Sequence, residues 1–326
     1  GPSAVATPAA RLMPALLAAL PLLLGKRRAA RRSGASHRVR RAARRTAPAA
    51  RGTAGALSAC QVRVAGEHLV DGAGRRVLHR GISLGGLSKV PRSPDGATHR
   101  TSRAFYDHRA VSFVGRPCGI DELDGHLARL QSWGFTLLRL IVTWEAVEHS
   151  GPGEYDYEYL AYIRTVCQRA GDFGFTVIVD PHQDCWSRWT GGDGAPGWTL
   201  EAANLVVGPQ LHSSGAAFLH QENGDPLPSM SWPGNYDRLA CATMWALFWA
   251  GDRVAPGLAP RLGREVAPSL QGLMQTSFIG AMSAVAQELN DVPCVLGFET
   301  LNEPHPGWLG NADLDSATPG PITTGQ

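Results

Sequence analysis

Short apolar segments without a helical period recur along the chain, and the clearest are LLRLIV at 137–142 and TVIVD at 176–180. Nearly continuous apolar runs of this length are typical of strands that are buried on both faces, as in a parallel sheet. A further apolar run, VLGF at 295–298, starts two residues after Pro293, and Pro304 ends the segment. The predicted strands of the main sheet are 77–84, 137–142, 176–180 and 295–301.

Segments with helical spacing alternate with these strands. Apolar residues at 120, 123, 127 and 130 predict a helix that Gly134 ends, and Gly174 ends the next one in the same way. The predicted helices are 120–133, 157–173, 239–248 and 270–289. This alternation predicts an α/β fold with a parallel sheet and helical crossovers. A small hairpin, 61–64 with 68–70, precedes it, and a long insertion rich in Trp, Gly and Pro spans about 183–235.

The last predicted strand ends in Asn302-Glu303-Pro304. In an α/β barrel the carboxyl ends of the strands carry the chemistry. An acidic residue there, beside an amide and before a proline, suits a general acid on a rigid support. The alternative is that Glu303 only solvates a strand end.

The third predicted strand ends in Asp180-Pro181-His182-Gln183-Asp184, and Trp186 follows closely. A carboxylate, an imidazole and an amide then lie beside an aromatic ring. A sugar stacks its apolar face on such rings and pairs its hydroxyls with such polar groups, so this segment predicts a carbohydrate pocket. The alternative is a loop capped by its own side chains.

Two charged residues belong to the second predicted strand or its end. Arg139 lies inside LLRLIV, where an unpaired charge is costly. It predicts either a structural ion pair or an arginine below the active site that tunes carboxylate pKa values. Glu145 follows the strand as a catalytic candidate or, as we favour, a cap of the next helix. Trp245 and Trp249 have i, i+4 spacing, which favours core packing over a site for an apolar aglycone.

The charge of the chain is divided unevenly. Thirteen of the 31 Lys and Arg residues lie in 1–66, before the first acid, so 18 basic residues face 28 acidic ones in the remainder, a net charge of −10. The basic total therefore gives no argument for nucleic acid as a partner. Residues 1–59 are predicted to be a low-complexity leader, either an organelle transit segment or a membrane anchor with a basic flank. A disordered extension or an error in the gene model is the alternative.

The spacing of the cysteines and the absence of several standard motifs argue against metal sites, nucleotide sites and serine-nucleophile sites. The six cysteines are widely spaced, without CxxC or another metal-ligand spacing, and are expected to be mainly buried thiols. The sequence contains no GxGxxG after a strand, no P-loop, no HExxH and no GxSxG. We expect neither a metal nor an organic cofactor.

Five segments carry a family resemblance that runs from about residue 61 to 310. They are HRGISLGGLSK, GFTLLRLIVTWEAVEHSGPGEYDYEYL, VIVDPHQDCWSRWTGGDGAPGWTLE, HQENGDPLPSMSWPGNYDRLACATMWALFW and VLGFETLNEPHPG. Together they resemble glycoside hydrolase family five, and most closely its glucosylceramidases, sterylglucosidases and endoglycoceramidase-like enzymes. The resemblance implies a (β/α)8 TIM barrel and retaining hydrolysis of β-glycosides.

The resemblance also implies roles for individual residues. Glu303 matches the general acid/base, and Asn302 matches the amide that holds the 2-hydroxyl of the sugar. The arginine of the second strand is matched by Arg139 and the histidine of the third by His182. Further sugar contacts are expected from Asp180, Lys89 and Trp186.

One part of the family pattern has no match. A retaining mechanism needs a nucleophilic carboxylate roughly 5 Å from the acid/base, and in this family it comes from the seventh strand. Residues 60–326 are therefore expected to form the N-terminal half of a barrel that is truncated after the fourth strand, and the fragment alone is expected to be inactive.

The expected function is a β-glucosidase for glycolipids such as glucosylceramide or sterylglucoside, with a β-glucoside of a lipid as the partner and contact with a membrane surface as a further expectation. One alternative is an inactive fragment or a carbohydrate- or lipid-binding remnant. The other is an endo-acting, cellulase-like hydrolase of the same family. The aromatic, Gly-rich insertion argues mildly against an open polysaccharide cleft.

Overall fold

The computed structural model describes residues 62–98, 102–222, 232–260 and 269–311. The described residues belong to the second of two units of the chain, Ala59–Gln326. The predicted leader, 1–59, lies outside the described residues. None of the helices in the described part is both long and apolar enough to cross a membrane.

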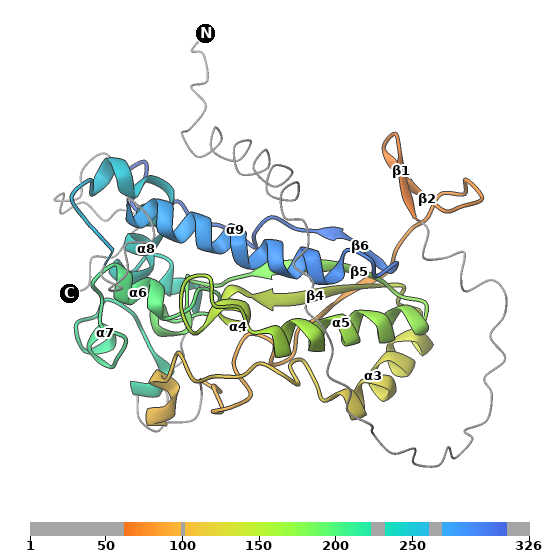
Figure 1. The fold of residues 1–326 in the computed structure, drawn as a ribbon, viewed down its shortest axis with the longest axis horizontal. Helices are drawn as coiled ribbons and strands as arrows, with labels where there is room; N and C mark the ends of the chain where they lie inside the picture. The colour runs from red at the N-terminus through yellow and green to blue at the C-terminus, as the bar shows by residue number, and fades with distance from the viewer. Residues whose placement is uncertain (1–61, 99–101, 223–231, 261–268, 312–326) are drawn as a thin grey trace, which may run out of the picture. The chain divides into compact units, whose positions relative to one another are not determined.

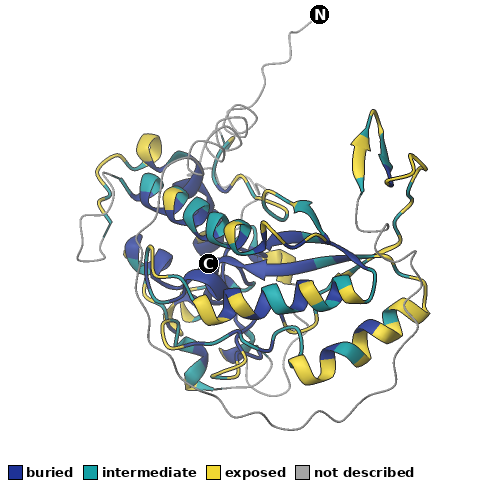
Figure 2. Ribbon diagram, turned by 45° about the vertical axis from the view of Figure 1, so that its right-hand side comes forward, coloured by how far each residue is buried: buried dark blue, intermediate teal, exposed yellow. Residues whose placement is uncertain are grey.

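A four-stranded parallel sheet forms the centre of the second unit (Figure 1). Its strands pair in the order of the sequence. They are β3 (Gly81–Leu84), β4 (Leu137–Thr143), β5 (Thr176–His182) and β6 (Val295–Phe298). The predicted parallel order is therefore confirmed. The first strand starts four residues later than predicted, since Gly81 pairs with Leu137, the first residue of β4. The two central strands are almost entirely buried, as Figure 2 shows.

Three of the long helices agree closely with their predicted ranges, namely α3 (Ile120–Ser132), α5 (Tyr157–Asp172) and α9 (Leu270–Leu289). The fourth, α8 (Leu239–Val254), extends six residues beyond the predicted 239–248. Asp156 caps α5 by accepting a 2.9 Å hydrogen bond from the N–H of Tyr159, and Ser269 caps α9 through the N–H of Gly272 at 3.0 Å. Gly134 and Gly174 adopt φ of +81° after α3 and α5, which is why these helices end there. The helices α3, α5 and α9 pack beside one another along the sheet.

Two smaller features complete the unit. The predicted hairpin is present as antiparallel β1 (Arg63–Ala65) and β2 (His68–Val70). The insertion is built from short helical turns. They are η2 (Arg188–Thr190), α6 (Trp198–Ala202), α7 (Gln210–Ser213), η3 (His220–Glu222) and η4 (Trp232–Asn235). A further 3-10 turn, η1 (Arg103–Tyr106), precedes α3.

A short helix that the pattern did not predict, α4 (Trp144–Glu148), follows β4 directly. Thr143 is its N-cap and accepts a hydrogen bond from the N–H of Ala146 at 3.2 Å. The capping role favoured for Glu145 is therefore wrong, because its carboxylate is fully buried and binds Arg188 instead.

Most tryptophans of the insertion and α8 form a core rather than an open surface, although Trp232 is exposed. Trp245 and Trp249 are buried and stack with ring centroids 5.9 Å apart, so the core-packing interpretation of their spacing is confirmed. Trp186 lies in the same cluster, with its ring 5.1 Å from that of Trp245 and 6.2 Å from that of Trp144.

Candidate active site

The carboxyl ends of β4, β5 and β6 bring most of the predicted polar residues to one edge of the sheet. Arg139 pairs in register with Ile178, two residues before Asp180 on the neighbouring strand. The segment after β6 continues to follow β5, because the N–H of Glu299 donates to the oxygen of Val179 at 2.8 Å. The N–H of Asn302 likewise donates to the backbone oxygen of Pro181 at 2.9 Å. Parallel pairing thus carries residues 299–302 to the same end as His182.

Arg139 links three of these polar groups. Its guanidinium donates two hydrogen bonds to the carboxylate of Glu299, at 2.7 and 2.6 Å, and one to Oδ1 of Asn302 at 3.1 Å. Its Nη1 also lies 3.0 Å from Oδ2 of Asp180. The structural interpretation of Arg139 thus has direct support, and the tuning interpretation has support as well. The hydrogen bonds from Arg139 lower the pKa of Glu299, although partial burial opposes this.

His182 continues the network away from Arg139. Its Nδ1 lies 2.7 Å from Oδ2 of the fully buried Asp180, and its Nε2 lies 3.3 Å from Oδ2 of Asp184. Burial alone would lower the pKa of His182, but the hydrogen bonds to Asp180 and Asp184 outweigh it and raise the pKa to about 9. Burial would raise the pKa of Asp184, but hydrogen bonds from His182 and Lys89 lower it to about 2. This part of the site is therefore charged at neutral pH.

Gln183 holds the turn that presents the predicted acid/base. Its side-chain Nε2 donates to the backbone oxygens of Asn302 and Glu303, at 2.7 and 2.9 Å. The backbone oxygen of Gln183 accepts a 3.0 Å bond from Nδ2 of Asn302. The N–H of Trp186 fixes the other amide atom, Oε1, at 3.1 Å. Gln183 is itself buried. The position of Asn302 is therefore determined from two sides, by Gln183 and by Arg139.

Glu303 differs from its neighbours in exposure and in backbone conformation. Its side chain is exposed, and its φ of +38° lies in the left-handed region, which is uncommon for a residue other than glycine. Its charge acts on Arg139: hydrogen bonds to Glu299, followed by the charges of Asp180, Glu299 and Glu303, raise the pKa of the guanidinium against the effect of burial. An exposed carboxylate on a strained turn that Gln183 and Arg139 hold in place can exchange protons with a bound molecule.

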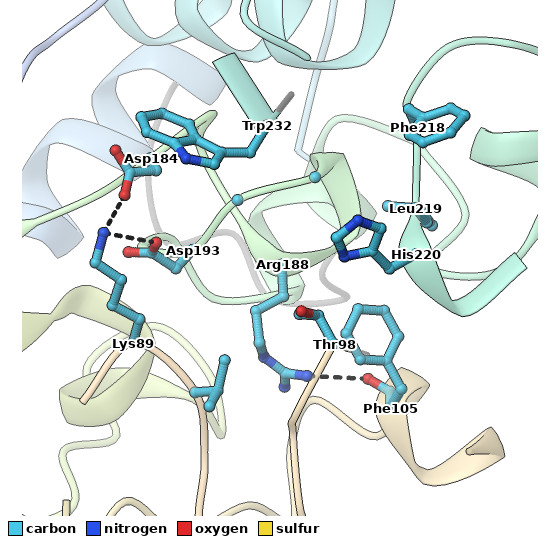
Figure 3. A pocket seen from close by; sticks show the side chains of 13 residues that line it. Lys89, Thr98, Phe105, Asp184, Arg188, Asp193, Phe218, Leu219, His220 and Trp232 are labelled. Carbon is cyan, nitrogen blue, oxygen red and sulfur yellow. Dashed lines mark hydrogen bonds and ion pairs between the residues drawn. The ribbon is translucent and has the colours of Figure 1, made fainter. Parts of the chain in front are cut away.

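The remaining predicted residues occupy different surroundings. Lys89 is half-buried and its ammonium binds Asp184 (Figure 3). Asp180 is fully buried between Arg139 and His182, so in this structure it positions those groups and has no exposed surface for a sugar. Trp186 is 3% exposed and its Nε1 donates to Thr199, so its ring packs in the core.

A pocket of about 290 Å³ opens beside Lys89. Its lining combines the charged groups of Lys89, Asp184 and Asp193 with aromatic and aliphatic side chains (Figure 3). Asp193, in the pocket lining, was not predicted from the sequence. Glu299 and the role of Gln183 at the sheet end were not predicted either. Glu299 did carry a signal, since it is a charged residue within the predicted strand that ends at Glu303.

Comparisons with known proteins agree with the resemblance seen in the sequence. The family model described as Cellulase (glycosyl hydrolase family 5) matches residues 109–206. The glucosylceramidase of Rhizopus delemar is 46% identical over 259 residues, which cover 78% of this chain and 37% of the relative. The ergosteryl-beta-glucosidase of Saccharomyces cerevisiae is 37% identical over 265 residues, covering 75% of this chain and 34% of the relative.

The fold is similar to that of a solved enzyme. Cryptococcus neoformans sterylglucosidase 1 superposes with a TM-score of 0.71 and 35% identity, over 79% of this chain and 37% of that structure. The chain thus spans little more than a third of the length of the proteins it matches. The resemblance to glycoside hydrolase family five is confirmed, as is the α/β fold of the TIM-barrel type, of which the described residues contribute four parallel strands.

Proposed function

We propose that this chain supplies the acid/base and part of the sugar-binding site of a retaining β-glucosidase that acts on glycolipids. The observation that supports it most directly is the Asn302-Glu303 turn, which is fixed by Gln183 and Arg139 and leaves Glu303 exposed. The substrate class rests on relatives named glucosylceramidase and ergosteryl-beta-glucosidase.

In the proposed reaction Glu303 first protonates the glycosidic oxygen, so that the lipid alcohol leaves. A second carboxylate attacks the anomeric carbon from the opposite face of the sugar and forms a glycosyl-enzyme intermediate. Glu303 then takes a proton from the water that hydrolyses this intermediate. Nδ2 of Asn302 is already bound to the carbonyl of Gln183, so the geometry of Asn302 is set before the 2-hydroxyl of the sugar arrives.

We propose further that the nucleophile is neither Glu299 nor Asp180. Glu299 accepts two hydrogen bonds from Arg139, and fully buried Asp180 is held between Arg139 and His182. A carboxylate bound in this way has less negative charge available for attack on carbon. The second carboxylate would then come from residues other than those that the structure describes.

A chimaera tests the proposal directly. Residues 62–311 of this chain would replace the matching segment of the Rhizopus delemar glucosylceramidase, and the chimaera would be assayed on glucosylceramide beside its Glu303→Gln variant. We expect turnover in the chimaera and a loss of roughly 10²–10⁴-fold in the variant, the usual contribution of general acid/base catalysis. Glu154→Gln, an exposed carboxylate outside the site, is the matched control.

The 326-residue chain alone, assayed on a fluorogenic β-glucoside, tests the assignment of the nucleophile. We expect no enzymatic turnover. Turnover that Glu303→Gln abolishes would show that the chain holds both carboxylates. An active chimaera that is insensitive to Glu303→Gln would overturn the acid/base assignment. Preference for cello-oligosaccharides over glucosylceramide would favour the cellulase-like alternative, and sugar binding without turnover in the chimaera would favour the binding remnant.

A further inference from the structure

One carboxyl oxygen at the pocket beside Lys89 has no hydrogen-bond donor. Asp193 lines this pocket, its side chain is only 5% exposed, and its Oδ1 is buried without a hydrogen-bond partner among the described residues. A buried carboxyl oxygen in this state is unfavourable unless a bound molecule supplies the missing partner. The residues that the proposed function assigns to the sugar do not include Asp193.

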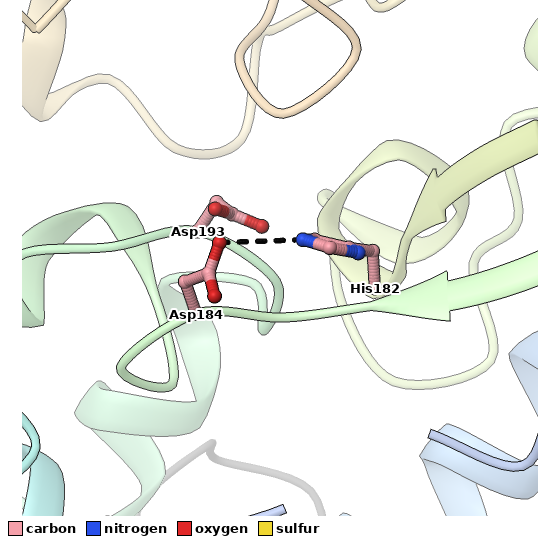
Figure 4. A group of neighbouring side chains, drawn as sticks. All are labelled: His182, Asp184 and Asp193. Atoms are coloured by element: carbon pink, nitrogen blue, oxygen red, sulfur yellow. Dashed lines mark hydrogen bonds and ion pairs between the residues drawn. The ribbon is translucent and has the colours of Figure 1, made fainter. Parts of the chain in front are cut away.

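The backbone holds Asp193 at the wall of the pocket. Figure 4 shows its side chain beside that of Asp184. The two residues form an isolated antiparallel bridge, with N–H to oxygen distances of 3.1 and 2.8 Å in the two directions. Gly192 permits this close approach, because a Cβ at that position would lie 1.7 Å from the backbone oxygen of Asp184. The carboxyl group of Asp193 is therefore in place before a ligand binds.

The ammonium group of Lys89 lies near Asp193 without a hydrogen bond to it. Its Nζ binds Asp184, whereas 3.7 Å separates it from Oδ2 of Asp193 (Figure 3). That distance exceeds the roughly 2.7–3.2 Å of an N–H···O hydrogen bond. An ammonium group has three N–H donors, so Lys89 can bind Asp184 and a ligand oxygen at once. A hydroxyl group between the two side chains would accept from Lys89 and donate to Asp193.

The pocket lies away from the proposed acid/base. Contacts between side chains lead from the Asn302-Glu303 turn to the pocket in the order Asn302, Arg139, Asp180, His182, Asp184 and Lys89. None of the described residues that line the pocket comes from 299–305. In a pyranose ring C4 lies opposite C1, and C5, which carries the hydroxymethyl group, lies opposite C2. With Glu303 at the glycosidic oxygen and Asn302 at the 2-hydroxyl, the pocket therefore faces the 4-hydroxyl and the 6-hydroxyl.

We propose that Asp193 is a specificity-determining residue, which together with Lys89 binds a hydroxyl group at the end of the glucose unit opposite the glycosidic bond. This inference rests on the proposed function, because it uses the orientation that Glu303 and Asn302 give to the sugar. The lipid alcohol then leaves on the side of Glu303, away from the pocket of about 290 Å³.

The electrostatics of Asp193 suit a hydroxyl ligand. Burial raises the pKa of Asp193 well above its usual range against the opposing charge of Lys89, and the charge of Asp184 adds to the rise. A carboxyl group that keeps its proton can both donate and accept a hydrogen bond, as a hydroxyl group does. Asparagine retains both capacities at this position, whereas alanine has neither.

Binding of simple sugars tests the proposal. The 326-residue chain would be titrated by calorimetry with methyl β-glucoside and with its 4-deoxy and 6-deoxy analogues, beside Asp193→Ala and Asp193→Asn. We expect the parent to bind one of the two analogues roughly tenfold or more weakly than the glucoside, the cost of one hydrogen bond to a charged group. Asp193→Ala should weaken binding of the glucoside by a similar factor and leave binding of that analogue nearly unchanged. Asp193→Asn should bind the glucoside nearly as well as the parent.

The pattern across the three sugars separates a contact from a structural role. An equal loss of affinity for all three in Asp193→Ala would overturn the proposal, as would a parent that binds them all alike or binds none. Asp172→Ala, which removes an exposed carboxylate of α5, is the matched control, and circular dichroism verifies folding. If Asp193→Ala does not fold, the affinities of the parent for the three sugars still decide. Because the readout is binding, an inactive chimaera would overturn the proposed function, whereas equal losses for all sugars would overturn only this inference.

Discussion

Two parts of the molecule that hold buried or partly buried carboxylates neutralise them differently. At the ends of β5 and β6, Asp180 and Glu299 share the guanidinium of Arg139. In α4, Glu145 has its own buried arginine, Arg188, whereas Glu148 has no ion-pair partner among the described residues. Within the described residues, the carboxylate of Glu148 accepts hydrogen bonds from Nε1 of Trp144, at 2.6 Å, and from the N–H of Gly153, at 2.5 Å.

This difference shows that a perturbed carboxyl group does not by itself identify an active site. Burial raises the pKa of Glu148 to about 8, a value that would suit a general acid. Its side chain nevertheless lies within the core, beside the aromatic cluster. Glu303, the proposed acid, is exposed at a strand end. Access to a substrate therefore identifies a candidate acid better than a raised pKa does.

Breaking the Arg188–Glu145 pair should have the largest effect. Arg188 is 1% exposed and donates two bonds to Glu145, at 2.9 and 2.6 Å, with a third to the oxygen of Phe105 at 3.0 Å. Arg188→Met leaves a buried carboxylate without its cation, and we expect a loss of about 3–5 kcal/mol in the free energy of unfolding by urea. The double variant Arg188→Met, Glu145→Leu should recover most of the lost free energy of unfolding.

Arg164→Met is the matched control for that experiment. Arg164 also forms a paired contact with a carboxylate, at 2.6 Å from Asp291, but that pair lies at the surface. Loss of this surface pair should lower the free energy of unfolding far less than loss of the buried Arg188–Glu145 pair. Equal losses in Arg164→Met and Arg188→Met would show that burial of the pair is not what matters.

Glu148 should make stability fall as the pH rises. Its folded-state pKa of about 8 exceeds the ordinary value of 4.5, so between these values the folded state keeps a proton that the unfolded state has lost. Stability is therefore highest below about pH 4.5 with respect to this group and is lost as the pH approaches 8. In Glu148→Gln, which keeps the acceptor oxygen, the fall between about pH 5 and 8 should be smaller by about 3 kcal/mol.

Chemical denaturation at several pH values measures this dependence. Glu154→Gln provides the control, because Glu154 is a nearby carboxylate that water solvates in both states. A pH dependence that is the same in the parent and in Glu148→Gln would contradict the assignment of the effect to Glu148.

The sequence predicted the parts of the fold that depend on local patterns. The apolar runs identified the four strands and their order, and the spacing of apolar residues identified the long helices. Asn302 and Glu303 were recognised because strand ends and short motifs are local as well. The helix α4 was missed, since five residues are too few to show a period.

The contacts that organise the site could not be predicted from local sequence patterns. Arg139 and Glu299 are separated by 160 positions, Gln183 and Asn302 by 119, and Arg188 and Glu145 by 43. Each pairing depends on strand register or loop geometry that the pattern does not specify. Glu145 illustrates the consequence: its position after a strand favoured a capping role at the next helix, whereas its carboxylate binds the distant Arg188.

Gln183 should contribute to stability at the sheet end, although less than the buried ion pair in α4. Gln183→Ala removes two side-chain hydrogen bonds to the Asn302-Glu303 turn and leaves two carbonyl oxygens without their donor. We expect a loss of about 1–3 kcal/mol in the free energy of unfolding.

Two comparisons sharpen the result for Gln183. Gln183→Glu retains the size of the side chain but not the N–H donor, so a similar loss would assign the effect to that donor. Gln131→Ala, which removes a single 2.7 Å bond to the oxygen of Phe173 at the surface, should cost less. A Gln183→Ala protein as stable as Gln131→Ala would mean that the turn holds its conformation without Gln183.

The smallest effect should come from Glu303, and it should have the opposite sign. With φ at +38°, Glu303 adopts a left-handed conformation that costs a residue with a long side chain about 1 kcal/mol or more. Asn tolerates this region better. Glu303→Asn should therefore raise the free energy of unfolding by about 0.5–1 kcal/mol, whereas Glu303→Gln, which keeps the strained backbone, should leave it nearly unchanged. Both substitutions would remove the proposed acid/base, so the chimaera should lose turnover with either. Urea denaturation of the three proteins side by side measures the difference. If Glu303→Asn is less stable than the parent, the turn does not store strain, and the contrast between a strained, exposed acid at the sheet end and relaxed, buried carboxylates in α4 would no longer hold.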